Sequence, residues 1–110
     1  MLQKAQRLTR LAFDTFLKTG KRFHSPTLTV VYTPHKAFHG SVVVGKKVAK
    51  LAVRRNTIRR RIYDQLRTVV HDTGATGVYI VLVKPTFNSL TRTAARAEVQ
   101  SLLYKIIKGT

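Results

Sequence analysis

The chain has 110 residues, which is the usual size of one compact domain. It carries 21 lysine and arginine side chains against 4 aspartate and glutamate side chains, so its formal net charge is +17. Apolar residues make up 44% of the sequence, which excludes a disordered basic tail, and the absence of cysteine excludes a disulfide-stabilised miniprotein. A folded protein with this charge is expected to bind a polyanion, and nucleic acid suits that need better than a small acidic substrate.

The longest apolar run of the sequence, Val78 to Val83, is too short to cross a membrane. A spanning helix needs about 20 apolar residues, and the core of a secretory signal needs roughly 7–15. We therefore expect no membrane partner and a cytoplasmic location.

The first half of the chain predicts one helix and two or three strands. Apolar residues recur at helical spacing from Leu8 to Leu17, and a glycine follows, which predicts a helix over 9–19. The β-branched and aromatic run Leu28–Tyr32 lies between two prolines and predicts a strand, which a short strand at 22–24 would precede. Ser41–Val44, flanked by glycines, predicts another strand.

From Val48 to about Val70 the apolar period becomes helical. The expected buried stripe of this helix consists of Leu51, Ile58, Ile62, Leu66 and Val69. A turn-rich segment at 71–77 separates the helix from the continuous apolar run 78–83, which is typical of a central strand covered on both faces.

After Pro85 the sequence predicts a last helix, with Ser89 or Thr91 as its N-cap. Its expected buried stripe consists of Ala95, Val99, Leu102, Leu103 and Ile106. The element order α-β-β-(β)-α-β-α predicts a single domain over residues 1–110, of class α+β, built as a two-layer sandwich of helices against a small sheet. Its net charge makes it a candidate RNA-binding domain.

The chain offers no evident catalytic or metal site. Its carboxylates lie in four separate segments, at Asp14, Asp64, Asp72 and Glu98. Acid–base catalysis by paired carboxylates needs two of them close together. His35 and His39 could share a metal ion only if their loop were helical, and no third ligand lies nearby in the sequence.

The segment around the long helix is strongly cationic and opposes a single carboxylate, Asp64. Its positive side chains are Lys46, Lys47, Lys50, Arg54, Arg55, Arg59, Arg60, Arg61 and Arg67. A solvated helix face normally mixes signs, because like charges three or four residues apart destabilise a helix. The one-signed pattern therefore predicts an RNA-binding surface.

Helical spacing places the polar residues of this helix on one side. Asn56, Arg60, Tyr63 and Arg67 fall opposite the apolar stripe, with Arg59 and Arg61 beside them. Guanidinium groups suit phosphates, an amide suits sugar or base edges, and a tyrosine ring can stack on a base. The same spacing tilts Arg55 toward the apolar stripe, so its direction stays open.

Aromatic side chains form a second candidate surface. Phe13, Phe16, Phe23 and Tyr32 could stack single-stranded bases, although aromatic residues at helical or strand spacing more often belong to a core. Both interpretations stay open, for Phe16 in particular.

The sequence resembles the protein component of bacterial ribonuclease P. The string from Lys46-Lys47 to Asn56, Arg59 and Arg60 is similar to the basic helix of that family. Phe13 to Lys21 resembles the family's N-terminal segment, and Val78 to Pro85 its late strand and turn. The likeness runs from about Arg7 to Ile107.

This resemblance implies the accessory protein subunit of an RNA-based endoribonuclease, which removes the 5′ leader of precursor tRNA during tRNA processing. Its partners would be the catalytic RNA subunit and precursor tRNA, with Mg²⁺ held by the RNA and no obligate protein partner. The residues that the resemblance assigns to RNA contact are Lys46, Lys47, Arg55, Asn56, Arg59 and Arg60. A leader cleft between the sheet and the first helix would be lined by Phe13 and Tyr32, with Phe16 and Leu17 as further candidates.

Two departures and one topological expectation accompany the resemblance. Thr57 stands where relatives carry a second arginine, so one phosphate contact is missing or has moved to Arg54 or Arg61. Leu17 stands where relatives often carry a second aromatic. The family also implies a left-handed crossover around the basic helix, although such connections are right-handed in about 98% of proteins. The alternative function is a ribosomal-type structural RNA-binding protein without nuclease association.

Overall fold

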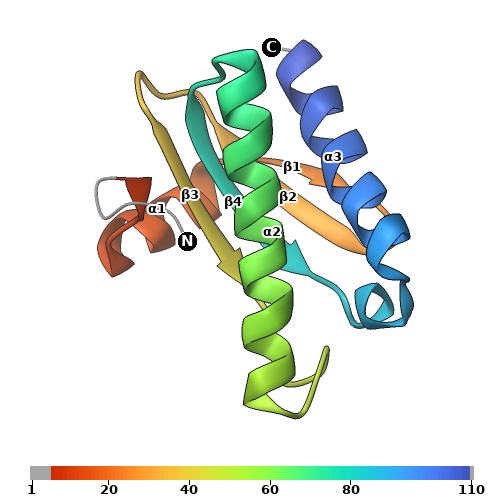
Figure 1. Ribbon diagram of the computed structural model, residues 1–110. Helices are drawn as coiled ribbons and strands as arrows, with labels where there is room; N and C mark the ends of the chain where they lie inside the picture. Colours follow the sequence, from red (N-terminus) through yellow and green to blue (C-terminus); the bar gives the residue numbers. More distant parts are fainter. Residues whose placement is uncertain (1–5, 110) are drawn as a thin grey trace.

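The computed structural model describes residues 6–109 and shows helices and strands in the expected order (Figure 1). The elements are α1 (Arg10–Thr19), β1 (Lys21–His24), β2 (Leu28–Thr33), β3 (Phe38–Val43), α2 (Ala52–Thr73), β4 (Gly77–Val83), the 3₁₀ helix η2 (Pro85–Ser89) and α3 (Arg92–Lys108). The short first strand and the α+β class are therefore confirmed. The extent of the domain over residues 1–110 stays a prediction, because residues 1–5 and 110 lie outside the described part.

The four strands form one mixed sheet in the order β1-β2-β4-β3. β2 runs antiparallel to both of its neighbours, β1 and β4. β3 runs parallel to β4, with Val42 opposite Val81. β4 has a partner on each side, as its continuous apolar run predicted. The expectation of a central strand is confirmed.

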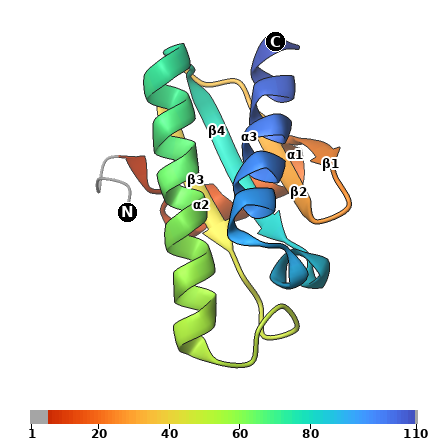
Figure 2. The same cartoon turned by 45° about the vertical axis from the view of Figure 1, so that its right-hand side comes forward.

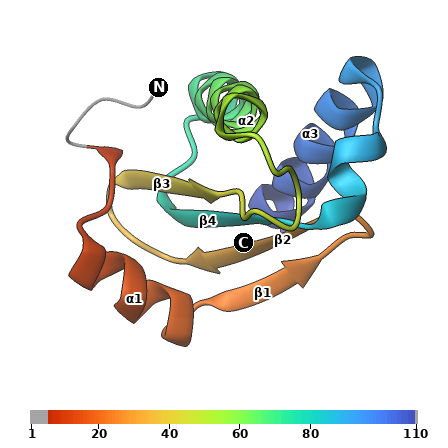
Figure 3. The same cartoon turned by 90° about the horizontal axis from the view of Figure 1, so that it is seen from below.

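Helices cover both faces of the sheet, with α2 and α3 on one side and α1 on the other (Figure 3). Because side chains alternate along a strand, Val30 and Val81 point into the larger core beneath α2 and α3. Val31 and Ile80 point to the opposite face, where α1 packs on them. The expected helix-on-sheet sandwich is present, and α1 adds a partial third layer.

The crossover from β3 through α2 to β4 is left-handed. In Figure 1, α2 lies in front of the sheet, both strands point downward, and β4 lies to the right of β3. A chain that follows this path turns against the hand that such connections normally have. The handedness implied by the resemblance is confirmed.

The long helix begins later than expected, at Ala52. Val48 and Ala49 are buried in the loop before it, so their apolar character reflects packing of that loop and not a helical turn. The assignment of Leu51 to the buried stripe is wrong, because it is the N-cap and its side chain is 73% exposed. The rest of the stripe is buried as expected, at Ile58, Ile62, Leu66 and Val69.

The last helix is capped by Thr91, which is one of the two expected candidates. The Thr91 side chain accepts a hydrogen bond from the N–H of Ala94 at 3.1 Å. Its expected stripe is buried at four positions and half-buried at Ala95. The η2 turn was not predicted. Within residues 6–109, no helix is both long and apolar enough to span a bilayer.

Candidate RNA interface

The side of α2 that faces away from the sheet carries the predicted polar residues. Asn56, Arg60 and Arg67 are all exposed there. Figure 2 shows α2 running along the outside of the molecule, with its outer face uncovered by any other element. The expected outward direction of Asn56 is therefore confirmed, and a long cationic face is available to a partner.

Tyr63 does not belong to this face, and its predicted stacking role is wrong. It is buried, and its hydroxyl oxygen accepts a hydrogen bond from the N–H of Val42 at 3.2 Å. β3 is the edge strand, so this N–H has no strand beside it. The tyrosine therefore supplies the missing acceptor and fixes α2 to the sheet edge.

The loop before α2 presents three exposed lysines, Lys46, Lys47 and Lys50. Arg55 holds this loop in place. Its Nη1 donates to the carbonyl oxygens of Ala49 at 3.0 Å and Lys50 at 2.7 Å. The open question of its direction is thus answered: Arg55 turns back from the first turn of α2, so part of its hydrogen-bonding capacity supports the loop.

Two local hydrogen bonds organise the exposed face of α2. Arg59 donates to the side-chain oxygen of Asn56 at 2.7 Å, which fixes that oxygen as the acceptor and directs the NH2 group of Asn56 to donate elsewhere. Arg67 pairs with Asp64 at 3.1 Å, and both side chains are about half exposed. This is the one ion pair within the described chain. Most of the positive charge is therefore free to meet phosphates.

Arg54 and Arg61 lie on the flank of α2 that faces α3 and line a cavity there together with Arg92 and Arg96 of α3. Sequence reasoning missed the two α3 arginines, although their spacing of four residues was a signal that both lie on one helix face. Thr57 donates to the carbonyl of Val53 at 3.0 Å and offers no positive charge. Arg61 is one helical turn further along from Thr57.

The α1 side of the sheet holds three of the four predicted cleft residues. Phe13, Phe16 and Leu17 are half-buried and pack on the small cluster of Val31, Val78 and Ile80. Phe16 also makes an edge contact with the ring of His35, with centroids 6.2 Å apart. These residues are therefore partly core and partly accessible.

Tyr32 lies on the other face, so its placement in the same cleft as Phe13 is wrong. Its ring packs against Tyr79 with centroids 5.0 Å apart, at the half-buried edge of the core under α2 and α3. The reason is the two-residue period of β2, which directs Val31 toward α1 and Tyr32 away from it. Phe23 shares the Tyr32 side, so the four aromatics form no common platform.

The side chain of Tyr79 is buried, and its hydroxyl group is hydrogen-bonded within the protein. Burial, with a smaller contribution from the neighbouring Tyr32, raises the pKa of Tyr79 from 10.0 to about 12. Its hydroxyl donates to the carbonyl oxygen of Thr76 at 3.0 Å. The side chain is therefore neutral at physiological pH and holds the turn that precedes β4.

The two loop histidines form no metal site with the other residues that the structure describes. His35 and His39 have ring centroids 5.0 Å apart, but the ring of His35 is hydrogen-bonded to the backbone of Ala37. Across residues 6–109, no three histidine, aspartate or glutamate side chains are grouped to hold a metal ion. The surface chemistry is that of phosphate recognition.

Comparison with protein families gives a match over nearly the whole chain. The model of the Ribonuclease P family matches residues 2–107. A ribonuclease P protein component from Chromobacterium violaceum is 33% identical and aligns with 96% of this chain and 89% of the relative. One from Synechococcus sp. is 30% identical over 96% of this chain and 84% of the relative.

Solved structures share the fold. The ribonuclease P protein of Staphylococcus aureus superposes with a TM-score of 0.75 at 24% identity, over 96% of this chain and 94% of that structure. The protein from Thermotoga maritima superposes with a TM-score of 0.70 at 20% identity, over 94% of this chain and 96% of that structure.

Proposed function

Since the chain belongs to the family of bacterial ribonuclease P protein components, we propose that it docks on the catalytic RNA subunit through α2 and grips the single-stranded 5′ leader of precursor tRNA. Membership makes it a subunit of a ribonucleoprotein endonuclease of tRNA processing. The docking surface and the leader contact are the finer parts of the proposal.

The observation that carries the docking proposal is the one-signed surface of α2 and the loop before it. Asn56, Arg60 and Arg67 face outward, and Lys46 and Lys47 extend this surface beyond the helix start. Arginine and lysine contacts to phosphate fix the register of a protein on a nucleic acid and release counterions. In this proposal, Arg55 positions the loop lysines, while Asn56 and Arg59 contact RNA as a hydrogen-bonded pair.

The leader proposal rests on the side of the sheet that α1 covers. Phe13, Phe16 and Leu17 keep part of their surface accessible, and bases of a single strand stack on such side chains at about 1–3 kcal/mol per base. Tyr32 is not part of this contact, because it faces the opposite core.

The division of labour follows from the chemistry of the chain. The protein offers cations and hydrogen-bond donors, which lower the repulsion between the catalytic RNA and precursor tRNA. In this proposal, the catalytic Mg²⁺ ions belong to the RNA subunit. No obligate protein partner is required, and the complex is expected in the cytoplasm, where precursor tRNA is made.

A comparison of the affinities for precursor and mature tRNA tests this function. The protein is assembled with a bacterial ribonuclease P RNA, and the complex is titrated with a precursor tRNA and with the same tRNA lacking its leader. We expect tighter binding of the precursor, and a loss of that preference when Phe13 and Leu17 are replaced by alanine. Equal affinity of the unmodified complex for both RNAs would overturn the leader contact. The alternative of a ribosomal-type protein without nuclease association is already excluded by the family membership.

A further inference from the structure

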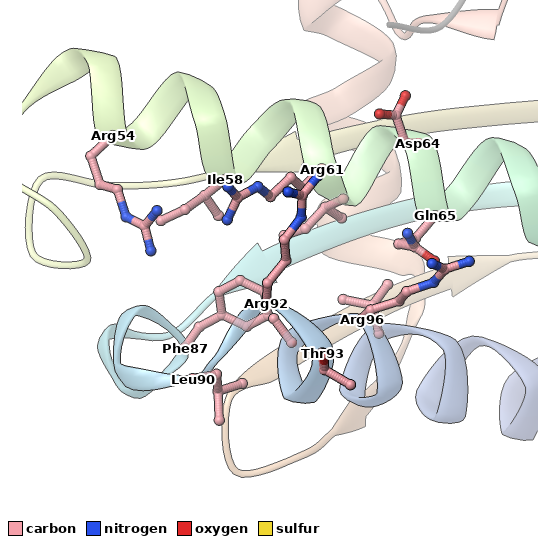
Figure 4. A pocket seen from close by; sticks show the side chains of 13 residues that line it. Arg54, Ile58, Arg61, Asp64, Gln65, Phe87, Leu90, Arg92, Thr93 and Arg96 are labelled. Atoms are coloured by element: carbon pink, nitrogen blue, oxygen red, sulfur yellow. The ribbon is translucent and has the colours of Figure 1, made fainter.

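A groove between α2 and α3 gathers four arginines around one cavity of about 300 Å³ (Figure 4). Arg54 and Arg61 enter it from α2, and Arg92 and Arg96 enter it from α3. Figure 4 shows Arg61 and Arg92 reaching into the same opening from the two helices. We call this the α2–α3 groove.

The floor of the α2–α3 groove is apolar. Ile58 of α2, Phe87 of η2 and Val99 of α3 line it and are buried, and Leu90 forms a half-buried rim. The groove thus combines a small apolar floor with guanidinium groups around it. Pockets of this kind hold ligands that have both an apolar ring and a charged group.

The positive charge of the α2–α3 groove is not balanced by the protein. Asp64 is its single acidic lining residue, and that carboxylate is paired with Arg67 at 3.1 Å. Like charges that share a partly enclosed site repel one another more strongly than they would in open water. An anion bound among the four guanidinium groups would remove this repulsion.

Hydrogen bonds hold the groove in shape at two points. The Nε of Arg54 donates to the side-chain oxygen of Asn88 at 3.0 Å, which ties α2 to η2. Further along, the amide of Gln100 donates to Gln65 at 2.8 Å and ties α3 to α2. The groove is therefore formed before any ligand arrives, which reduces the ordering that binding requires.

We propose that the α2–α3 groove binds one nucleotide unit of a single-stranded RNA, with its phosphate among Arg61, Arg92 and Arg96 and its base against the apolar floor. A cavity of about 300 Å³ is at the small end of ligand pockets and does not admit a duplex. This inference extends the RNA binding proposed above to a second surface, beside the outer face of α2.

The double variant Arg92→Gln/Arg96→Gln tests the groove without touching the outer face of α2. Both side chains are exposed, so the variant is expected to fold, and a thermal melt checks this. The control, Lys36→Gln/Lys108→Gln, removes the same charge from exposed positions outside the groove. Binding of a labelled hexamer of single-stranded RNA is measured by fluorescence anisotropy over a range of salt concentrations.

The groove variant is expected to bind the hexamer about tenfold or more weakly, with a salt slope lower by about 0.7, because the two arginines share one phosphate and each phosphate contact on a single strand contributes ~0.7. The control is expected to lose less than about threefold. Equal losses in the two variants would overturn the proposal, since bulk charge alone would then explain binding. The hexamer test needs no ribonuclease P RNA, so its failure leaves the docking proposal standing.

An NMR titration of the unmodified protein identifies the bound unit. Shifts of the Phe87 ring and the Arg92 and Arg96 side chains with the hexamer, or with a free nucleoside monophosphate, would support the site. If only the hexamer causes these shifts, the ligand of the groove is an RNA strand. If the monophosphate binds with equal affinity, the ligand is a single nucleotide. Inorganic phosphate or a hexaglutamate peptide binding as tightly as the nucleotide would overturn the role of the apolar floor.

Discussion

At the scale of single residues, two tyrosines lie elsewhere than their predicted positions. Tyr63 falls near the polar side of α2 by spacing, yet it is buried against β3 because an edge-strand N–H needs its hydroxyl. Tyr32 follows a strand residue that faces α1 and therefore points to the other core. The assignment of Tyr63 depended on which neighbour its side chain meets, which helical spacing alone does not give. The assignment of Tyr32 depended on which face of β2 would lie under α1.

Gly77 lies at a position where the backbone geometry and the neighbouring residues exclude any side chain. Its φ is +112°, and a Cβ there would lie 2.5 Å from Cε1 of Tyr32 and 3.2 Å from the carbonyl oxygen of Thr33. We expect Gly77→Ala to lower the free energy of unfolding by at least ~1–3 kcal/mol, measured by denaturant titration. Gly45→Ala is the matched control, because a Cβ at Gly45 meets nothing within 4 Å. Equal stability of the two variants would contradict this account of Gly77.

Tyr79 makes the fold sensitive to alkali. In the unfolded chain its hydroxyl loses a proton near pH 10.0, whereas in the fold its pKa is about 12. Above pH 10 the unfolded state thus releases a proton that the folded state keeps, so stability falls until about pH 12, by at most ~1.4 kcal/mol per pH unit from this group. Urea titrations from pH 8 to 12 measure this slope. Tyr79→Phe should decline less steeply, and an unchanged slope would exclude burial of Tyr79 as its cause.

At the scale of elements, the sequence was most informative where burial is continuous. The apolar run of β4 and the stripe Ile58–Val69 of α2 predicted elements that the structure confirms. The start of α2 was misplaced, because Val48 and Ala49 bury their side chains in a loop without helical hydrogen bonding. The η2 turn was not predicted because Phe87 is its single buried residue, and one apolar residue sets no periodic pattern.

The contact between α2 and β3 separates stability from RNA binding. Tyr63→Phe removes the acceptor of the buried Val42 N–H and should lower the free energy of unfolding by roughly 1–3 kcal/mol. Affinity for the ribonuclease P RNA should stay within about twofold at temperatures where the variant is folded, since Tyr63 is buried. A large loss of RNA affinity with unchanged stability would indicate that Tyr63 contacts RNA after all.

The outer face of α2 should control the salt dependence of RNA binding. Arg59→Gln/Arg60→Gln is expected to flatten the slope of log K against log salt by about one to two units, since each phosphate contact contributes ~0.7–0.9. Lys36→Gln/Lys108→Gln, with the same change in charge, should alter the slope far less. If the two variants gave the same slope, the outer face of α2 would not be the docking surface.

At the scale of the whole molecule, charge and topology were predictable to different degrees. The net charge of +17 and the near absence of carboxylates indicated a polyanionic partner directly. The left-handed crossover followed from the family resemblance, because local sequence physics favours the opposite hand. The convergence of Arg54 and Arg61 with Arg92 and Arg96 was not predictable, since it depends on how α2 and α3 pack.

The central claim is that this small basic protein assists a catalytic RNA. Its most direct test is release of a tRNA 5′ leader by a bacterial ribonuclease P RNA at a magnesium concentration too low for the RNA alone. The account predicts cleavage when the protein is added, none with protein alone, and weaker rescue by Arg59→Gln/Arg60→Gln than by Lys36→Gln/Lys108→Gln. Cleavage that is unchanged by the protein, or that the protein performs without RNA, would contradict it.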